Sequence, residues 1–126
     1  MIRTALIVED TPMAITPLEV ALAGIANLET MVVADGRKAI DYLEGDFGAN
    51  VCAVLTDLNM PILDGFELIA HLRSLKKFSS LPVLVLSGCT ENGAAKRSLD
   101  LGANAFFAKP YSPVEVRRKL EELLRA

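Results

Sequence analysis

Four short apolar runs in this chain each end close to a polar group. The runs and the groups that follow them are 5–8 with Glu9 and Asp10, 51–55 with Asp57, 83–86 with Ser87, and 105–108 with Lys109 and Pro110. The runs are near-continuous rather than alternating, which is typical of parallel strands covered on both faces. Because the carboxyl ends of parallel strands meet at one edge of a sheet, we expect these polar groups to lie together there.

Amphipathic segments of helix length separate the apolar runs, which is the pattern of βαβ units in an α/β fold. We predict five strands, at residues 5–8, 28–33, 51–56, 83–86 and 105–108, each followed by a helix. Capping boxes predict helix starts at Asp64 and at Ser112. The fourth helix is expected to begin at Thr90 or Glu91. Pro17 lies inside the first helix, where we expect it to kink the helix or delay its first turn.

The length, composition and charge of the chain restrict its class. Its 126 residues fit one domain, 52% of them are apolar, and the net charge is −3. Such a chain can bury one core and lacks the basic surface of a nucleic-acid-binding protein. We find no long apolar segment and no secretory leader, so we expect a cytoplasmic protein with no membrane contact. Cys52 and Cys89 match no metal-ligand spacing and are expected to be reduced.

The polar groups at the predicted edge include three acids, Glu9, Asp10 and Asp57. Two carboxylates about 4 Å apart repel each other by roughly 4 kcal/mol at an effective dielectric near 20. Such a cluster therefore needs cations, and Lys109 and a Mg²⁺ ion bound through oxygen atoms are the two candidates. Carboxylate, hydroxyl, ammonium and Mg²⁺ together make a site for phosphoryl transfer, in which an aspartate can be the nucleophile.

The same residues carry a family resemblance over essentially the whole chain. The matching features, in order, are Glu9-Asp10, then Asp57 with Leu58-Asn59-Met60-Pro61 and Asp64-Gly65, then Ser87-Gly88, Phe106 and Lys109-Pro110. The chain resembles the receiver domain of two-component response regulators, chemotaxis-type and single-domain, spanning residues 1–126. The resemblance implies a flavodoxin-like, doubly wound five-stranded parallel sheet in the order 2-1-3-4-5 with five helices.

The resemblance also assigns a metal site and a phosphoacceptor. It implies that Asp57 accepts the phosphoryl group. It further implies that Glu9, Asp10 and Asp57 hold Mg²⁺ together with the backbone carbonyl of Asn59.

Four further roles follow from the resemblance, at the ends of the last two strands. Lys109 is expected to pair with the acyl phosphate, and Ser87 is expected to bind one of its oxygens. Phe106 is expected to be a switch aromatic that turns inward when Ser87 moves toward the phosphate. The peptide bond before Pro110 is expected to be cis, a form that costs only about 0.5–1 kcal/mol before proline.

The resemblance implies a signalling role through protein partners. The donor would be a sensor histidine kinase or a histidine phosphotransfer protein. A downstream protein target would bind the face formed by helix four, strand five and helix five. The chain is expected not to be a turnover enzyme and not to bind nucleic acid directly, and dimerisation linked to phosphorylation stays open.

Other interpretations of these residues remain at this stage. One is a receiver-like binding module that is not phosphorylated, although such a scaffold has no need of the acids or of Lys109. Another is a phosphatase, which would require a second acid where Asn59 stands. A third is a flavodoxin-like carrier, whose phosphate would be repelled by Glu9 and Asp10. Asp64 is interpreted as a helix cap, and plain packing remains an alternative for Phe106.

Overall fold

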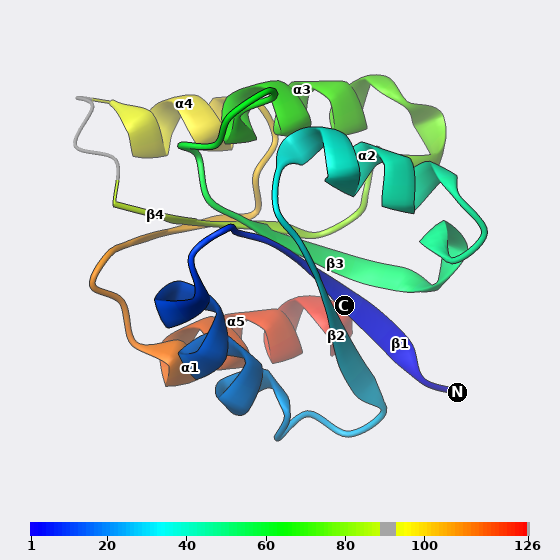
Figure 1. The fold of residues 1–126 in the computed structure, drawn as a ribbon, viewed down its shortest axis with the longest axis vertical. Coiled ribbons are helices and arrows are strands. Elements are labelled where there is room, and N and C mark those ends of the chain that lie inside the picture. The colour runs from blue at the N-terminus through cyan, green and yellow to red at the C-terminus, as the bar shows by residue number, and fades with distance from the viewer. Residues whose placement is uncertain (89–92, 126) are drawn as a thin grey trace.

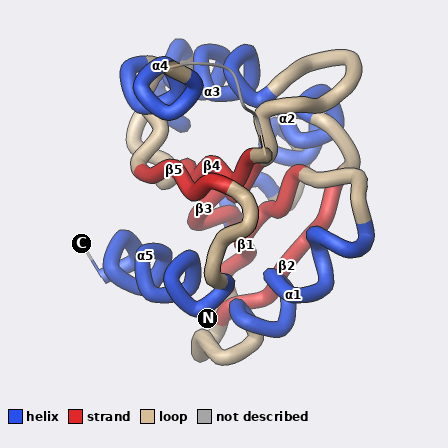
Figure 2. Tube along the Cα trace, turned by 90° about the vertical axis from the view of Figure 1, so that its left-hand side faces the viewer, coloured by secondary structure: helices blue, strands red, loops and turns tan. Residues whose placement is uncertain are grey.

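Five parallel strands form a single sheet in the order β2-β1-β3-β4-β5 (Figures 1 and 2). The computed structural model describes residues 1–88 and 93–125. The strands are β1 (Arg3–Val8), β2 (Leu28–Val33), β3 (Val51–Thr56), β4 (Val83–Ser87) and β5 (Ala105–Ala108). The predicted fold class and strand order are therefore confirmed. Ser87 is the last residue of β4 rather than the first residue after it.

Helices cover both faces of the sheet. They are α1 (Pro12–Leu22), α2 (Gly36–Glu44), α3 (Gly65–Ser74), α4 (Ala94–Asp100) and α5 (Pro113–Arg125), with short 3-10 turns η1 (Gly48–Asn50) and η2 (Lys76–Phe78). Helices α2, α3 and α4 lie on one face, and α1 and α5 lie on the other (Figures 1 and 2). Within the described ranges, no helix has the length and apolar character needed to cross a bilayer. The start predicted for the fourth helix lies outside the described residues.

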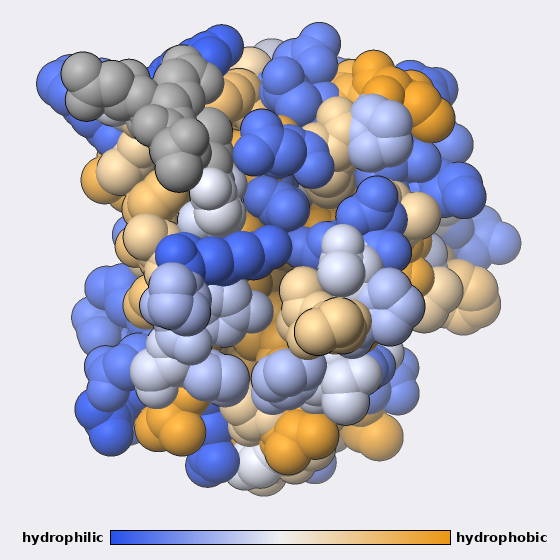
Figure 3. Space-filling model, turned by 60° about the vertical axis from the view of Figure 1, so that its left-hand side comes forward, coloured by the Kyte–Doolittle hydropathy of each residue, from blue (hydrophilic) through white to orange (hydrophobic). Residues whose placement is uncertain are grey.

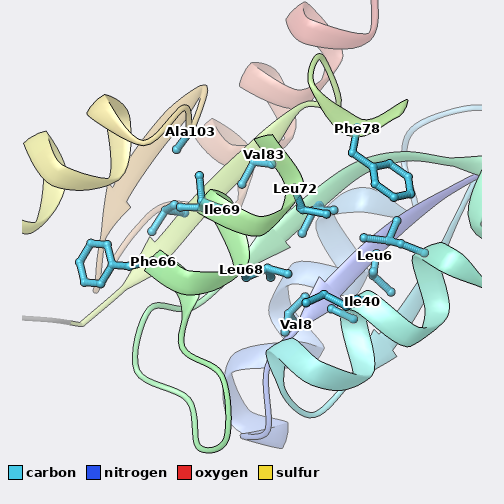
Figure 4. Packing of buried hydrophobic residues seen from close by; sticks show 14 of the residues in the cluster. Leu6, Val8, Ile40, Phe66, Leu68, Ile69, Leu72, Phe78, Val83 and Ala103 are labelled. Carbon is cyan, nitrogen blue, oxygen red and sulfur yellow. The ribbon is translucent and has the colours of Figure 1, made fainter. Parts of the chain in front are cut away.

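The sheet divides the core into two hydrophobic layers. Leu6 and Val8 of β1 pack in the layer beneath α2 and α3, part of which is shown in Figure 4. Ala5 and Ile7, their neighbours along the strand, pack in the layer beneath α1 and α5. This alternation explains the near-continuous apolar runs, because a strand with both faces covered needs apolar residues at every position.

The short edge strand β5 contributes one aromatic residue to each layer. Phe106 is half-buried and packs against the layer beneath α2 and α3. Phe107 is also half-buried and packs against the layer beneath α1 and α5.

The prediction that Pro17 delays the first turn of the first helix is wrong. Helix α1 begins at Pro12 and continues through Pro17 to Leu22. A proline here leaves the carbonyl four residues earlier, that of Met13, without its helical donor. The side chains of Met13 and Pro17 are both exposed, so this part of the helix faces water, which can hydrogen-bond the carbonyl.

Side-chain caps start several helices as predicted. Asp64 Oδ1 accepts from the Glu67 amide at 2.8 Å, and Glu67 Oε1 accepts from the Asp64 amide at 3.0 Å, which completes the capping box of α3. At α5, Ser112 Oγ accepts from the Glu115 amide at 3.4 Å, but the Glu115 carboxylate pairs with Arg118 instead of returning to the Ser112 amide, so the capping box predicted at Ser112 is only half formed. The first box sets where α3 begins, directly after the loop that follows Asp57.

Replacing Asp64 with alanine is expected to lower the free energy of unfolding by about 0.5–2 kcal/mol, because the first turn of α3 loses its cap. Urea denaturation would measure the change. Asp41→Ala is the matched control, since Asp41 makes only an exposed pair with Arg37 and such pairs contribute less than about 1 kcal/mol. Equal losses in the two variants would contradict a stabilising role for the box.

Candidate functional site

The ends of β1, β3 and β5 bring two carboxylates and one ammonium group together. Lys109 Nζ donates to Glu9 Oε2 and to Asp57 Oδ2, each at 3.3 Å. The Glu9 and Asp57 side chains are only 9% and 13% exposed, so water screens their charges weakly. Figure 3 looks toward this edge of the sheet and shows hydrophilic side chains gathered between the two helical layers. The predicted convergence of Glu9, Asp57 and Lys109 is confirmed.

The backbone holds the Asp57 carboxylate in one orientation. Asp57 Oδ1 accepts from the Leu58 amide at 2.6 Å and from the Asn59 amide at 3.3 Å. The carbonyl oxygen of the same Asp57–Leu58 peptide accepts from the Thr56 hydroxyl at 2.8 Å. Thr56 is fully buried. Because this peptide is bonded at both its carbonyl and its amide, Oδ1 is fixed and Oδ2 is left facing Lys109.

A close approach to α3 also restrains this peptide. The Gly65 amide donates to the Leu58 carbonyl at 2.9 Å. A Cβ atom at Gly65 would clash with the Asp57 carbonyl oxygen and would lie 2.7 Å from Leu58 Cα. Any side chain at position 65 would therefore push the backbone beside the carboxylate out of place.

The two neighbouring acids Glu9 and Asp10 occupy different environments. Glu9 is buried, and its Oε1 accepts from the amides of Asp10 and Thr11, both at 3.1 Å. Asp10 is exposed, and its Oδ1 accepts from the Thr11 hydroxyl at 3.3 Å. Glu9 is thus tied to the backbone and to Lys109, whereas Asp10 presents its carboxylate to solvent.

Lys109 offsets one of the two negative charges of Glu9 and Asp57. Partial burial alone would lower the pKa of Lys109, but the charges of Asp57 and Glu9 and the hydrogen bonds to them outweigh burial and raise it. Tyr111 lies nearby, and burial raises the pKa of its hydroxyl; Glu9 and Asp57 add to that effect while Lys109 opposes it. The ammonium form of Lys109 is therefore the form that the folded site stabilises.

The acids at this edge have the chemistry of a magnesium site. Over residues 1–88 and 93–125, no three Asp, Glu, His or Cys side chains lie close enough to enclose a metal ion. Magnesium does not require such an enclosure, since proteins hold it through one or two carboxylates while it keeps several waters. The oriented carboxylate of Asp57 and the solvent-facing carboxylate of Asp10 are hard oxygen donors that fit this requirement.

The remaining predicted residues lie around this cluster. Ser87 is buried at the end of β4, and its carbonyl accepts from the Lys109 amide at 2.9 Å. Phe106 pairs with Val85 of β4 in the sheet register. The Lys109–Pro110 peptide is cis, as predicted. Cys89 lies outside the described residues.

Thr56 is a functional neighbour that the sequence analysis missed, and Gly65 was noted there only as part of the family resemblance, without its contact to the Asp57–Leu58 peptide. Their signals were present, since Thr56 is the one hydroxyl in an otherwise apolar strand and Gly65 follows a capping aspartate. Neither signal shows which atoms the residue touches, because the contacts depend on how the loop after β3 folds back onto α3.

The fold and the site together define a doubly wound α/β domain with an acid–lysine cluster at the carboxyl edge of its sheet. The sequence profile of the response regulator receiver domain matches residues 5–121. The chain belongs to this family and is a signalling domain of the two-component type.

Individual relatives agree with this assignment. The Chemotaxis protein CheY homolog of Campylobacter jejuni is 29% identical over 121 residues, which cover 94% of this chain and 90% of that protein. The crystal structure of a putative response regulator from Chloroflexus aurantiacus has a TM-score of 0.88 at 28% identity, covering 100% of both chains. The receiver domain of a sensor histidine kinase from Pseudomonas aeruginosa, with a magnesium ion coordinated in its active site cleft, has a TM-score of 0.84 at 27% identity, covering 100% of both chains.

The raised pKa of Lys109 predicts a specific dependence of stability on pH. The ion pairs contribute fully below the ordinary lysine value of 10.5 and are lost as the pH rises through the higher folded value. The difference in unfolding free energy between the parent protein and Lys109→Met should therefore be constant from pH 8 to about 10 and shrink above about 10.5. Both proteins should carry Tyr111→Phe, which removes a hydroxyl that interacts with Lys109 and titrates in the same range. A difference that stays constant to the highest pH reached would contradict a stabilising ion pairing of Lys109 with Glu9 and Asp57.

Proposed function

We propose that Asp57 accepts a phosphoryl group from a histidine of a sensor histidine kinase or a histidine phosphotransfer protein. The observation that carries this proposal is the position of Lys109, 3.3 Å from both Glu9 and Asp57. Because Lys109 is shared between the two carboxylates, it can follow charge that develops on Asp57 while it keeps its contact to Glu9. Family membership supports the same assignment.

The transfer is a substitution at phosphorus. Asp57 Oδ2 attacks the phosphorus atom as the bond from phosphorus to the donor imidazole nitrogen breaks, and that nitrogen keeps the electron pair. The product is an acyl phosphate on Asp57 and a free histidine on the donor. Lys109 stabilises the transferring group electrostatically, and its contact to Glu9 keeps the ammonium beside the site throughout.

The acids position a divalent cation in this proposal. Asp10 and Asp57 would hold Mg²⁺ through carboxylate oxygens together with the backbone carbonyl of Asn59, and Glu9 would contribute negative charge from behind them. When bound, Mg²⁺ neutralises charge on the phosphoryl oxygens. The backbone bonds to Asp57 Oδ1 keep the attacking oxygen aimed at the donor before it arrives.

Ser87 and Phe106 connect the acyl phosphate to the surface that a partner would bind. Ser87 would bind a phosphate oxygen, and the half-buried ring of Phe106 on the neighbouring strand would then turn inward. The face made by α4, β5 and α5 carries the exposed apolar side chains Leu99 and Val114, which suit a protein target. The target would favour the phosphorylated state only through contacts that differ between the two states.

The domain has a second apolar surface, beside Lys109, where the donor would bind. Met13, Pro17 and Val20 are exposed along α1 at helical spacing. A hollow of about 230 Å³ lies between this helix and the segment that begins at Lys109. Since the hollow reaches the lysine of the site, a donor seated there would be close to Asp57.

In this proposal residues 1–126 act as one receiver domain in the cytoplasm. Asp57 is phosphorylated and later dephosphorylated, and the chain does not turn over a separate substrate.

The proposal is tested by intact-mass analysis after incubation with acetyl phosphate and Mg²⁺. The protein should gain the mass of one phosphoryl group, and Asp57→Asn should gain none. Asp41→Asn is the control, because Asp41 is an exposed acid on α2 and should leave labelling unchanged. Labelling that survives Asp57→Asn, or its failure in the unaltered protein, would overturn the proposal.

Thr56→Val is expected to slow this labelling roughly tenfold, because the Asp57–Leu58 peptide loses the bond that orients the carboxylate. Thr56→Ser keeps the hydroxyl and should restore most of the rate. Circular dichroism would confirm that both variants fold. Normal labelling of a folded Thr56→Val variant would show that the hydroxyl does not position Asp57.

A further inference from the structure

The loop between β3 and α3 contains a strained residue that packing does not explain. The Leu63 amide donates to the Pro61 carbonyl at 2.7 Å, which closes a three-residue turn around Ile62. Ile62 has a φ of 71°. A hydrogen-bonded turn with positive φ at its central residue is the rare, strained form of the γ-turn. A β-branched side chain at positive φ is an outlier, whereas glycine or asparagine adopts such angles readily.

The side chain of Ile62 receives no compensation from the folded domain. It is 79% exposed. A single exposed apolar residue is ordinary by itself. At position 62, however, the residue is unfavourable for the backbone and contributes nothing to the core.

The rest of the loop is anchored, so the turn cannot relax. Met60 and Leu63 pack against the layer beneath α2 and α3 on either side of Ile62. Leu63 also lies against Gly36, where a Cβ atom would come within 2.6 Å of Leu63 Cδ2. The loop before α3 extends away from the buried side chains in Figure 4. Ile62 is therefore held outward on a rigid support.

The position of the loop indicates which partner meets this side chain. The loop begins at Asp57, whose Oδ1 accepts from its first two amides. A protein that delivers a phosphoryl group must bring a histidine into contact with Asp57, so it must also touch the rim of the site. A downstream target has no such requirement, because it can bind a remote face.

We propose that Ile62 is a docking residue for the phosphoryl donor protein, and that it inserts into an apolar patch beside the donor's phosphohistidine. This inference rests on the proposed function. The strain persists because the folded domain anchors the loop at both ends. The exposed side chain of Ile62 provides a contact with the donor.

The proposal separates protein donors from small-molecule donors. Each purified sensor histidine kinase of the source organism would be autophosphorylated with radiolabelled ATP, and each histidine phosphotransfer protein would be phosphorylated from these kinases. Each donor would be mixed with the unaltered protein, and the fastest donor, called the kinase below whichever type it is, would be kept. Transfer from that kinase and labelling by acetyl phosphate would then be compared for Ile62→Ala, Ile62→Gly and Phe47→Ala. Phe47 is the control because it is 69% exposed but lies before the start of β3, at the opposite end of that strand from the site loop.

Both Ile62 variants should lower kcat/KM for transfer from the kinase about tenfold, as expected for loss of an apolar contact at an interface. Their labelling by acetyl phosphate should stay within about twofold of the unaltered protein, because a small molecule does not reach Ile62. Ile62→Gly should in addition raise the melting temperature, since glycine relieves the strained φ. Phe47→Ala should leave both rates unchanged.

Several outcomes would overturn the docking role and leave the proposed function intact. These are normal transfer from the kinase to Ile62→Ala, an equal loss with acetyl phosphate, or an equal loss in Phe47→Ala. A failure of acetyl phosphate to label the unaltered protein would instead contradict the proposed function itself. If acetyl phosphate labels it and neither a sensor histidine kinase nor a histidine phosphotransfer protein does, the protein donor and the docking role fail together.

Discussion

The site depends on one ammonium group placed between two poorly solvated carboxylates. Glu9 and Asp57 come from different strands and are both largely buried, so without a cation their mutual repulsion would oppose the folding that brings β1 and β3 together. Lys109 reaches them from a third strand. Three segments that are distant in sequence thus share one electrostatic contact, and removing the lysine would leave two poorly solvated negative charges beside each other with no cation between them.

The parallel sheet is what makes this contact geometrically simple. Every strand delivers its last residue to the same edge, and the layers on both faces keep the strands in register. Backbone hydrogen bonds then orient the two carboxylates. Backbone amides that follow Glu9 donate to one oxygen of its side chain, and backbone amides that follow Asp57 donate to one oxygen of the Asp57 side chain. The oxygens that face Lys109 are those that remain.

Much of the fold and part of the site could be predicted from the sequence, for identifiable reasons. Strand positions follow from continuous apolar runs, and the start of α3 follows from Asp64 and Glu67, because these signals are local in the chain. The convergence of Glu9, Asp57 and Lys109 follows from the geometry of parallel sheets. The phosphoryl transfer, the metal ligands and the switch role of Phe106 stay predictions, since they concern states with bound groups.

Other features required the three-dimensional structure. Pro17 was expected to disturb the start of α1, but its effect depends on whether the carbonyl it frees faces water. Glu9 and Asp10 are adjacent at the end of β1, but the side chain of Glu9 is buried and that of Asp10 is exposed, and this depends on how the chain turns there. The positive φ of Ile62 depends on anchors at Met60 and Leu63, and nothing in the local sequence, which contains neither glycine nor asparagine at that position, would suggest it.

Strand β5 packs against both hydrophobic layers, and this determines which layer a substitution in the strand affects. Phe106 belongs to one hydrophobic layer and Phe107 to the other, although they are adjacent in a strand of four residues. A substitution of Phe106 therefore alters packing in the layer beneath α2 and α3, whereas a substitution of Phe107 alters packing in the layer beneath α1 and α5. Because β5 leads directly into Lys109, the strand that supplies the ammonium group of the site is supported from both sides of the sheet by different side chains.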